Sequence, residues 1–277
     1  MTVHIVTDSA SDMPKALTSE LDIAVVPLTV RFGDEPEIVD GSISPQDFWR
    51  RCQAAPVLPQ TSAPSAGDFE EAFRKAGADG DGVVCVTLSA DLSATFASAT
   101  AAAKALEGEI PVRVIDTRSC SMGEGLVALT AHEAALSGAT VDEVAEAARS
   151  AAGRTRVLAA LDTLENLRKG GRIGGAQAMI GSLLSIKPII EIHGTVESES
   201  KQRTRSRAMQ YLVDKVKSVG PLHRLAVVHG EASDVEEFTE MLEPLAPASG
   251  IIVSDVGAVI GAHSGPRLLG VTYQTST

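Results

Sequence analysis

Short apolar runs alternate with helical segments along the whole chain. In the N-terminal half the β-branched and apolar runs predict strands at 4–7, 23–27, 83–88 and 112–116, and the segments between them predict helices, among them 94–106, 125–136 and 141–152. The run at 83–88 is continuously apolar, which is typical of a parallel strand buried on both faces. Ser44-Pro45 and Thr140 followed by Glu143 are predicted helix starts, because each places a capping hydroxyl before a first turn.

The same alternation continues in the C-terminal half. Strands are predicted at 157–160, 189–192, 225–229 and 251–256, and helices near 206–218 and 234–245. Strands that alternate with helices at this spacing predict an α/β fold. We therefore expect two α/β domains: an N-terminal parallel sheet flanked by helices over residues 1–155, and a smaller C-terminal α/β domain over residues 156–277.

Composition excludes several classes of protein. The 277 residues contain 24 Lys and Arg against 36 Asp and Glu, for a net charge of −12, which argues against nucleic-acid binding. No apolar run approaches the ~18 residues of a membrane span, and residues 1–5 lack the features of a secretory signal. Cys52, Cys85 and Cys120 are far apart, so neither a disulfide framework nor a metal site is expected, and a cytoplasmic location is predicted.

Several nucleotide and hydrolase motifs are missing from the sequence. There is no P-loop, no HExxH and no GxSxG segment. Residues 123–128 fit GxGxx[GA], but six residues separate them from the strand that ends near Asp116, whereas a dinucleotide-binding turn follows its strand directly. We interpret these glycines as relieving a tight turn at a helix start and expect no cofactor, with a dinucleotide site as the alternative.

Two loops rich in hydroxyl groups are candidates for an anion site. Residues 60–65 (QTSAPS) precede a predicted helix, and residues 87–95 (TLSADLSAT) connect a buried strand to another helix. Hydroxyls and backbone N–H groups at a helix start can bind an anion, and in a doubly wound sheet such loops gather at one edge. Ordinary helix capping, without a ligand, is the alternative for each loop.

Seven short motifs occur in series along the chain: Asp8-Ser9, Asp40-Gly41, TSAPS at 61–65, LSATFASA at 92–99, RKGGRI at 168–173, IKP at 186–188 and AHSGP at 262–266. In kind and order they resemble the DegV family. The resemblance implies a two-domain α/β protein that binds one long-chain fatty acid as a carrier subunit and is not itself an enzyme. It also implies a separate ATP-binding kinase subunit that phosphorylates the bound carboxylate to acyl phosphate for phospholipid synthesis.

The resemblance also implies roles for individual residues. Carboxylate contacts carry over to Thr61 and Ser93, with Ser62 and Thr95 beside them, and Arg172 and His263 are expected near the head group or the phosphoryl transfer. The family usually has Gly and Tyr where this chain has Ala94 and Phe96, and often Gln in place of Ala63. We expect Ala94 to open a helix, where alanine causes no strain.

The acyl chain requires apolar walls, and the scarcity of aromatic residues indicates aliphatic ones. The candidates are Met179, Ile180, Leu183, Leu184 and Ile186, with plain core as the alternative for each. At ~0.8 kcal/mol per buried methylene the tail should set affinity, and the hydroxyls should set orientation.

A run of cations is a candidate docking surface for the kinase subunit. Lys201, Arg203, Arg205 and Arg207 occupy every second position, which predicts one face of a strand, and Arg168 and Lys169 could extend it. An edge strand protected by charge is the alternative. His263 is predicted to lie on a turn between Gly261 and Gly265.

Two other functions stay open on the sequence alone. The chain could be a stand-alone nucleotide-dependent small-molecule enzyme, which would bind ATP or NAD by itself. It could also be a lipid-binding regulator with no kinase partner, which the sequence does not separate from the carrier subunit.

Overall fold

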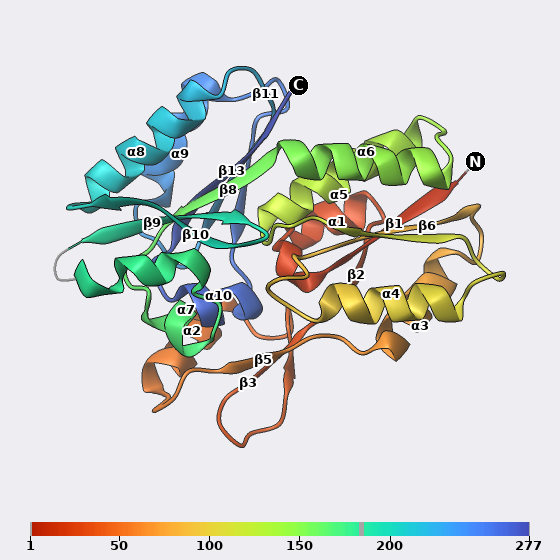
Figure 1. Cartoon of the computed structure of the whole chain (residues 1–277), viewed down its shortest axis with the longest axis horizontal. Coiled ribbons are helices and arrows are strands. Elements are labelled where there is room, and N and C mark those ends of the chain that lie inside the picture. The colour runs from red at the N-terminus through yellow and green to blue at the C-terminus, as the bar shows by residue number, and fades with distance from the viewer. Residues whose placement is uncertain (1, 183–185, 277) are drawn as a thin grey trace.

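The structure is a computed structural model that describes residues 2–182 and 186–276, and two large sheets lie next to each other in it (Figure 1). One sheet comes from the N-terminal half of the chain and the other from the C-terminal half, with helices covering their faces. The predicted α/β fold class is confirmed. Within the described ranges, no helix combines the length and apolar character that a bilayer crossing requires.

The first sheet is parallel and has four strands in the order β2-β1-β6-β7. Its strands are β1 (Val3–Asp8), β2 (Ala24–Val26), β6 (Gly82–Thr87) and β7 (Val112–Asp116). Every residue of β6 is buried, as its continuous apolar run predicts. Alternate residues point to opposite faces: Val83 and Cys85 join one apolar cluster, and Val84 and Val86 join another.

Helices cover both faces of this sheet. The helices of the chain are α1 (Lys15–Glu20), α2 (Pro45–Ala54), α3 (Ala66–Ala76), α4 (Thr95–Ala105), α5 (Met122–Leu136), α6 (Val141–Arg154), α7 (Glu165–Lys169), α8 (Arg205–Ser218), α9 (Val235–Leu242) and α10 (Ala258–Ser264), with 3-10 turns at η1 (Ser9–Ser11), η2 (Gly174–Ser182) and η3 (Glu243–Leu245). Helices α3 and α4 cover one face of the parallel sheet, and α5 and α6 cover the other. Ser44 caps α2, and Thr140 with Glu143 forms a capping box on α6, as predicted.

The second sheet is mixed and has six strands in the order β10-β9-β8-β13-β11-β12. Its strands are β8 (Thr155–Ala160), β9 (Lys187–His193), β10 (Thr195–Gln202), β11 (Leu222–His229), β12 (Ile251–Asp255) and β13 (Leu269–Thr275). Only β11 and β12 pair in parallel, and the other neighbours are antiparallel. Helices α8 and α9 cover one face, and the other face is turned toward the first sheet.

One apolar core joins the two sheets. It includes Ile5 and Val84 of the parallel sheet, Leu126 of α5, and Val157 and Ile190 of the mixed sheet. Helix α5 lies at this junction, and a Cβ atom on Gly123 would lie 2.4 Å from Cγ2 of Val157. The glycines of the GxGxx[GA] segment therefore lie in the first turns of a helix, where the small size of Gly123 permits close packing on β8.

A third sheet brings the first of the two hydroxyl-rich loops, residues 60–65, close to α10. It has three strands in the order β4-β3-β5, namely β3 (Thr29–Arg31), β4 (Ile38–Val39) and β5 (Gln60–Ser62). Helix α10 contacts both β3 and β5, and α7 lies beside it. This arrangement places segments from four distant parts of the chain around one space.

Two local predictions are wrong. His263 lies in the last turn of α10, not on a turn outside regular structure, because the helix runs through to Ser264 before Gly265 turns the chain with a φ of 78°. The cations after residue 200 do not share one strand face, because β10 ends at Gln202 and Thr204 caps α8 by accepting a hydrogen bond from the N–H of Arg207.

Candidate functional site between the two sheets

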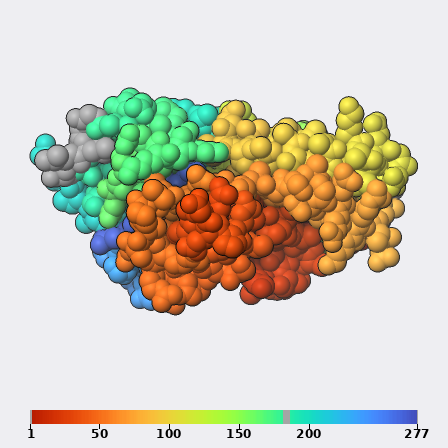
Figure 2. Space-filling view, turned by 90° about the horizontal axis from the view of Figure 1, so that it is seen from below, coloured from red at the N-terminus to blue at the C-terminus, as the bar shows by residue number. Residues whose placement is uncertain are grey.

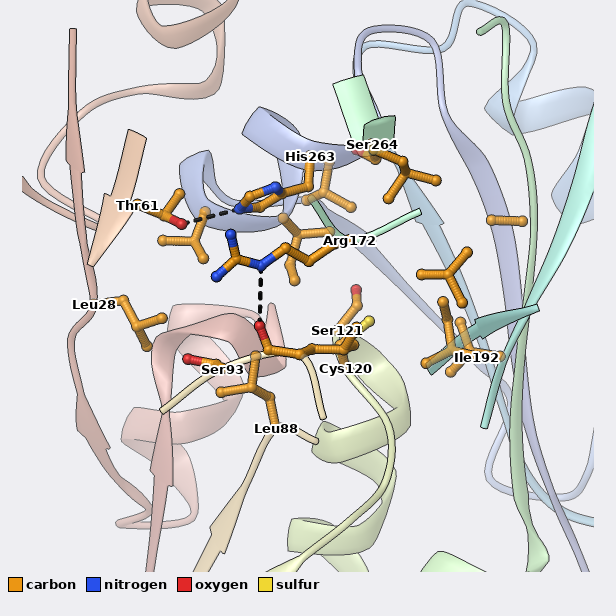
Figure 3. A pocket seen from close by; sticks show the side chains of 18 of the residues that line it. Leu28, Thr61, Leu88, Ser93, Cys120, Ser121, Arg172, Ile192, His263 and Ser264 are labelled. Atoms are coloured by element: carbon orange, nitrogen blue, oxygen red, sulfur yellow. Dashed lines mark hydrogen bonds between the residues drawn. The ribbon is translucent and has the colours of Figure 1, made fainter. Parts of the chain in front are cut away.

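A cavity of about 310 Å³ lies where the two sheets and α10 meet (Figure 3). Its lining comes from the third sheet, from the loops after β6 and before α5, from one face of the mixed sheet, and from α10. The volume is within the range of ~300–1,000 Å³ that small-molecule sites occupy. Most of the lining is apolar, which favours a hydrocarbon ligand.

The apolar wall is one face of the mixed sheet. Val157 and Ala159 of β8 lie opposite Ile192 and Ile190 of β9, and all four line the cavity. Gly270 of β13 pairs with Ala159. A Cβ atom on Gly270 would lie 2.8 Å from Cγ2 of Val228, another lining residue. Because side chains alternate across a strand, these residues form one continuous aliphatic surface. Gly270 adds no side chain that would displace Val228 from it.

Polar side chains gather on the side of the cavity away from Ile192 (Figure 3). Oγ1 of Thr61 and Nε2 of His263 are 2.9 Å apart. Nε of Arg172 donates to the carbonyl of Leu92 at 3.2 Å, and its Nη1 donates to the carbonyl of Gly170 at 2.7 Å. A guanidinium has five N–H donors, so these bonds hold its orientation without using all of them.

Ser93 reaches the cavity from the loop before α4. Its Oγ is 2.9 Å from Oγ1 of Thr95 and accepts a hydrogen bond from the N–H of Thr95 at 3.3 Å. Ala94 has a φ of −74°, so it is unstrained at the helix start, as predicted. Thr95 itself is fully buried, and its side chain holds the Ser93 hydroxyl through this hydrogen bond.

His263 is held as a neutral imidazole. Burial, together with the nearby charge of Arg172, lowers its pKa to about 4. Its ring packs so closely on Gly170 that a Cβ atom there would lie 2.3 Å from Nδ1 of His263. The first glycine of the RKGGRI motif, Gly170, therefore contacts the histidine of the AHSGP motif, and any larger residue at 170 would displace the ring.

The mouth of the cavity reaches the surface. Arg172, which follows α7, and Ser62 of β5 are exposed, and Thr61 and Ser93 are half-buried. From below, the orange segment that contains α2 and β5 borders the green segment that contains α7 (Figure 2). A head group bound at these side chains would thus lie near solvent while its tail lies inside.

Comparison with known proteins agrees with this architecture. A family model described as "Uncharacterised protein, DegV family COG1307" matches residues 2–276. The chain belongs to the DegV family. It is 41% identical over 280 residues to a DegV domain-containing protein of Streptomyces coelicolor, covering 99% of this chain and 98% of that one. It is 33% identical over 281 residues to DegV of Bacillus subtilis, covering 99% of both chains.

Solved structures of the DegV family share the fold. A Thermus thermophilus DegV family protein, described with its fatty-acid binding, matches at a TM-score of 0.92 with 31% identity, covering 99% of this chain and 100% of that one. A Thermotoga maritima protein described as revealing a fatty acid binding function matches at 0.85 with 30% identity, covering 99% of both chains. Fatty-acid binding is thus described for these two relatives.

The structure brings together most of the DegV residues that the sequence singled out. Thr61, Ser62, Ser93, Arg172 and His263 all line the cavity. Thr95 is adjacent but contacts Ser93 instead of the cavity. These residues come from positions up to 202 apart in the chain, and the contact between Thr61 and His263 spans that interval.

The three aliphatic tunnel candidates that the structure describes are not among the residues that line the cavity. Met179 is buried in the shared core, and Ile180 and Ile186 are half-buried. Leu183 and Leu184 lie outside the described residues. Among the described residues the cavity is instead lined by strand residues of the mixed sheet and by Val259 and Ile260 of α10.

Most of the basic candidates have acidic neighbours. Arg205 donates to both carboxylate oxygens of Asp234 at 2.7 and 2.9 Å, and its side chain is only 14% exposed. Arg168 and Lys169 pair with Glu165 at 2.7 and 3.3 Å on the surface. Lys201 and Arg203 are exposed. Arg205 thus joins α8 to the start of α9, whereas the other cations lie at the surface.

Four acidic residues near the DegV site were given no functional role by the sequence analysis, although Asp8 and Asp40 belong to two of its motifs. Asp8, Asp12, Asp40 and Glu124 are all buried. Burial raises the pKa of Asp8 to about 7 and also raises that of Asp12, Asp40 and Glu124. One signal was visible, because Glu124 is a single acid among apolar residues and glycines in the segment MGEGLVAL.

Proposed function

We propose that this chain binds one long-chain fatty acid, with the tail in the cavity between the sheets and the carboxylate at its mouth. The observation that carries the proposal is an apolar cavity with polar side chains from Thr61, Ser93, Arg172 and His263 on one side. Three relatives of known structure, which are 29–31% identical to this chain, are described as fatty-acid-binding. Their descriptions support the same class of ligand here.

The chemistry of the mouth suits a carboxylate that must react. Thr61 and Ser93 offer neutral hydroxyls, and His263 is neutral at physiological pH because its pKa is lowered to about 4. Such donors orient a carboxylate without enclosing both oxygens, whereas a bidentate arginine clamp would occupy them. Arg172 is oriented by two backbone carbonyls and lies beside the site as an exposed cation.

We further propose that a separate ATP-dependent kinase subunit phosphorylates the bound acid. One carboxylate oxygen attacks the terminal phosphorus of ATP, the bond to ADP breaks, and acyl phosphate forms for phospholipid synthesis. The exposed mouth supports this, since the partner must reach the head group, and Arg172 would balance the charge of the transferred phosphoryl group. Arg168, Lys169, Lys201 and Arg203 stay candidates for the docking surface, whereas Arg205 is already paired with Asp234.

The ligand is tested by native mass spectrometry of the purified protein. We expect one fatty acid per chain under gentle conditions and its loss on denaturation. Ser93→Ala should weaken binding, and Thr100→Ala, which removes an exposed hydroxyl further along α4, should not. A protein that carries no acid and takes none up from solution would refute the proposal.

The kinase partnership is tested separately. The protein loaded with palmitic acid is used to capture partners, and captured fractions are assayed for acyl phosphate in the presence of ATP. Arg172→Ala should keep lipid binding and reduce acyl phosphate formation. If lipid binds and no captured fraction yields acyl phosphate, the lipid-binding regulator becomes the better description.

A further inference from the structure

The N-terminus of α10 is held by two carboxylates from distant parts of the chain. Oδ1 of Asp12 accepts a hydrogen bond from the N–H of Gly257 at 2.8 Å, and Oδ1 of Asp40 accepts one from the N–H of Ala258 at 3.0 Å. The first N–H groups of a helix have no partner within it, so these bonds satisfy them. Both carboxyl groups are buried.

The two carboxylates are themselves held in place. Oγ of Ser9 donates to Oδ2 of Asp40 at 2.8 Å, and Oγ of Ser121 donates to Oδ2 of Asp12. Oγ of Ser9 also accepts a hydrogen bond from the N–H of Leu28 at 3.0 Å. Leu28 and Ser121 both line the cavity, so the same network joins its walls to α10.

Helix α10 links this clamp, formed by Asp12 and Asp40, to the mouth of the cavity. The helix has only seven residues, and its last turn carries His263, which lies 2.9 Å from Thr61. Its side is closely packed, because a Cβ atom on Gly261 would lie 2.7 Å from Cε1 of Phe48. Packing against Phe48 therefore restricts lateral movement of α10, and the two carboxylates hold its N-terminal end.

The clamp borders a different space from the one that the apolar wall borders. Asp12, Asp40, Gly257 and Ala258 line a second cleft of about 1130 Å³, and Val256 lines both spaces. Asp12 and Asp40 do not line the first cavity, so a change at either carboxylate can reach a bound head group only through α10 or through the walls they hold.

We propose that Asp12 and Asp40 are positioning residues that set the place of α10 and thereby hold His263 against Thr61 at the head-group site. This inference rests on the proposed fatty-acid function for its effect on binding. Its structural part, the contact between His263 and Thr61, is independent of any ligand.

The test compares Asp40→Ala with the conservative Asp40→Asn, which keeps an oxygen for the N–H of Ala258. Asp40→Ser, which is too short to reach Ala258, serves as a second disruptive variant. Asp68→Ala is the matched control, because Asp68 also accepts hydrogen bonds at a helix start, in the capping box of α3, and does not line the cavity. The readouts are the affinity for palmitic acid and the ¹⁵N chemical shifts of the His263 ring, which report its hydrogen bond in the ligand-free protein.

We expect Asp40→Ala and Asp40→Ser to shift the His263 resonances and to weaken palmitic acid binding about tenfold, the effect of a misplaced hydrogen bond to a charged group. Asp40→Asn should restore both readouts, and Asp68→Ala should leave both unchanged. Unaltered His263 resonances in both disruptive variants would overturn the inference, as would equal losses of affinity in Asp40→Ala and Asp68→Ala. If the unmodified protein binds no palmitic acid, the proposed function fails, and the His263 resonances still decide the positioning role.

Discussion

Replacing Ala159 with leucine should shorten the acyl chain that the cavity accepts. Ala159 lies in the middle of the apolar wall, between Ile190 of β9 and Gly270 of β13, and its side chain points into the cavity. The larger side chain adds three carbon atoms to this space. It should therefore displace about three methylene groups of a ligand that fills the cavity.

The size of the effect follows from the transfer of hydrocarbon out of water. At ~0.8 kcal/mol for each buried methylene, the loss of three amounts to ~2.4 kcal/mol, or about a 50-fold weaker Kd. An acid with a chain about three carbons shorter fits beside the new leucine and should bind the variant and the unmodified protein equally well. The preferred chain length should therefore move, while the head-group contacts stay the same.

The assay is a series of saturated acids of increasing length, measured by displacement of a fluorescent fatty acid. Ala160→Leu is the matched control, because Ala160 is the next residue of β8 and faces the packed core beneath α8. That variant should lose ~1–3 kcal/mol of stability through overpacking and keep the original chain-length preference. Equal weakening of every acid by Ala159→Leu, or no weakening of any, would refute the placement of the tail.

Three further outcomes are expected. Ser93→Ala should weaken fatty-acid binding by ~1–3 kcal/mol with little change in melting temperature, measured by titration and calorimetry. Burial raises the pKa of Asp8 from 3.8 to about 7 and raises that of Glu124, so the folded protein keeps protons that the unfolded chain releases. The contribution of these two carboxyl groups to the stability of the fold is complete below pH ~4 and is lost as the pH rises through 7. Glu124→Gln should reduce this pH dependence of the free energy of unfolding, measured by urea titration. Arg205→Ala should lower stability by ~1–3 kcal/mol, because Asp234 loses a bidentate partner, and should leave fatty-acid affinity unchanged.

The parallel sheet was predictable because its signals are local. The run at β6 is apolar from Val83 to Val86, and the caps at Ser44 and Thr140 mark their helices by side chains within three residues. The mixed sheet was harder to predict. Strand β13 was not predicted, although it lies at the centre of that sheet between β8 and β11, because its pairing partners lie far away in the sequence.

The mouth of the site was predictable and its walls were not. Thr61, Ser93, Arg172 and His263 occur in short motifs whose kind and order along the chain resemble the DegV family. Val157, Ala159 and Ile192 look like ordinary strand residues, since a cavity face and a core face have the same apolar pattern. Only the placement of the two sheets decides which face borders the cavity.

Asp8 and Asp40, which begin two of the sequence motifs, hold backbone segments that border the cavity. Oδ2 of Asp8 accepts a hydrogen bond from the N–H of Leu88 at 3.0 Å, and Asp40 accepts one from Ala258. Leu88 lines the cavity, and α10 carries His263 to its mouth. Burying a carboxyl group is costly, and these backbone N–H groups offset part of the cost while fixing the loops around the ligand.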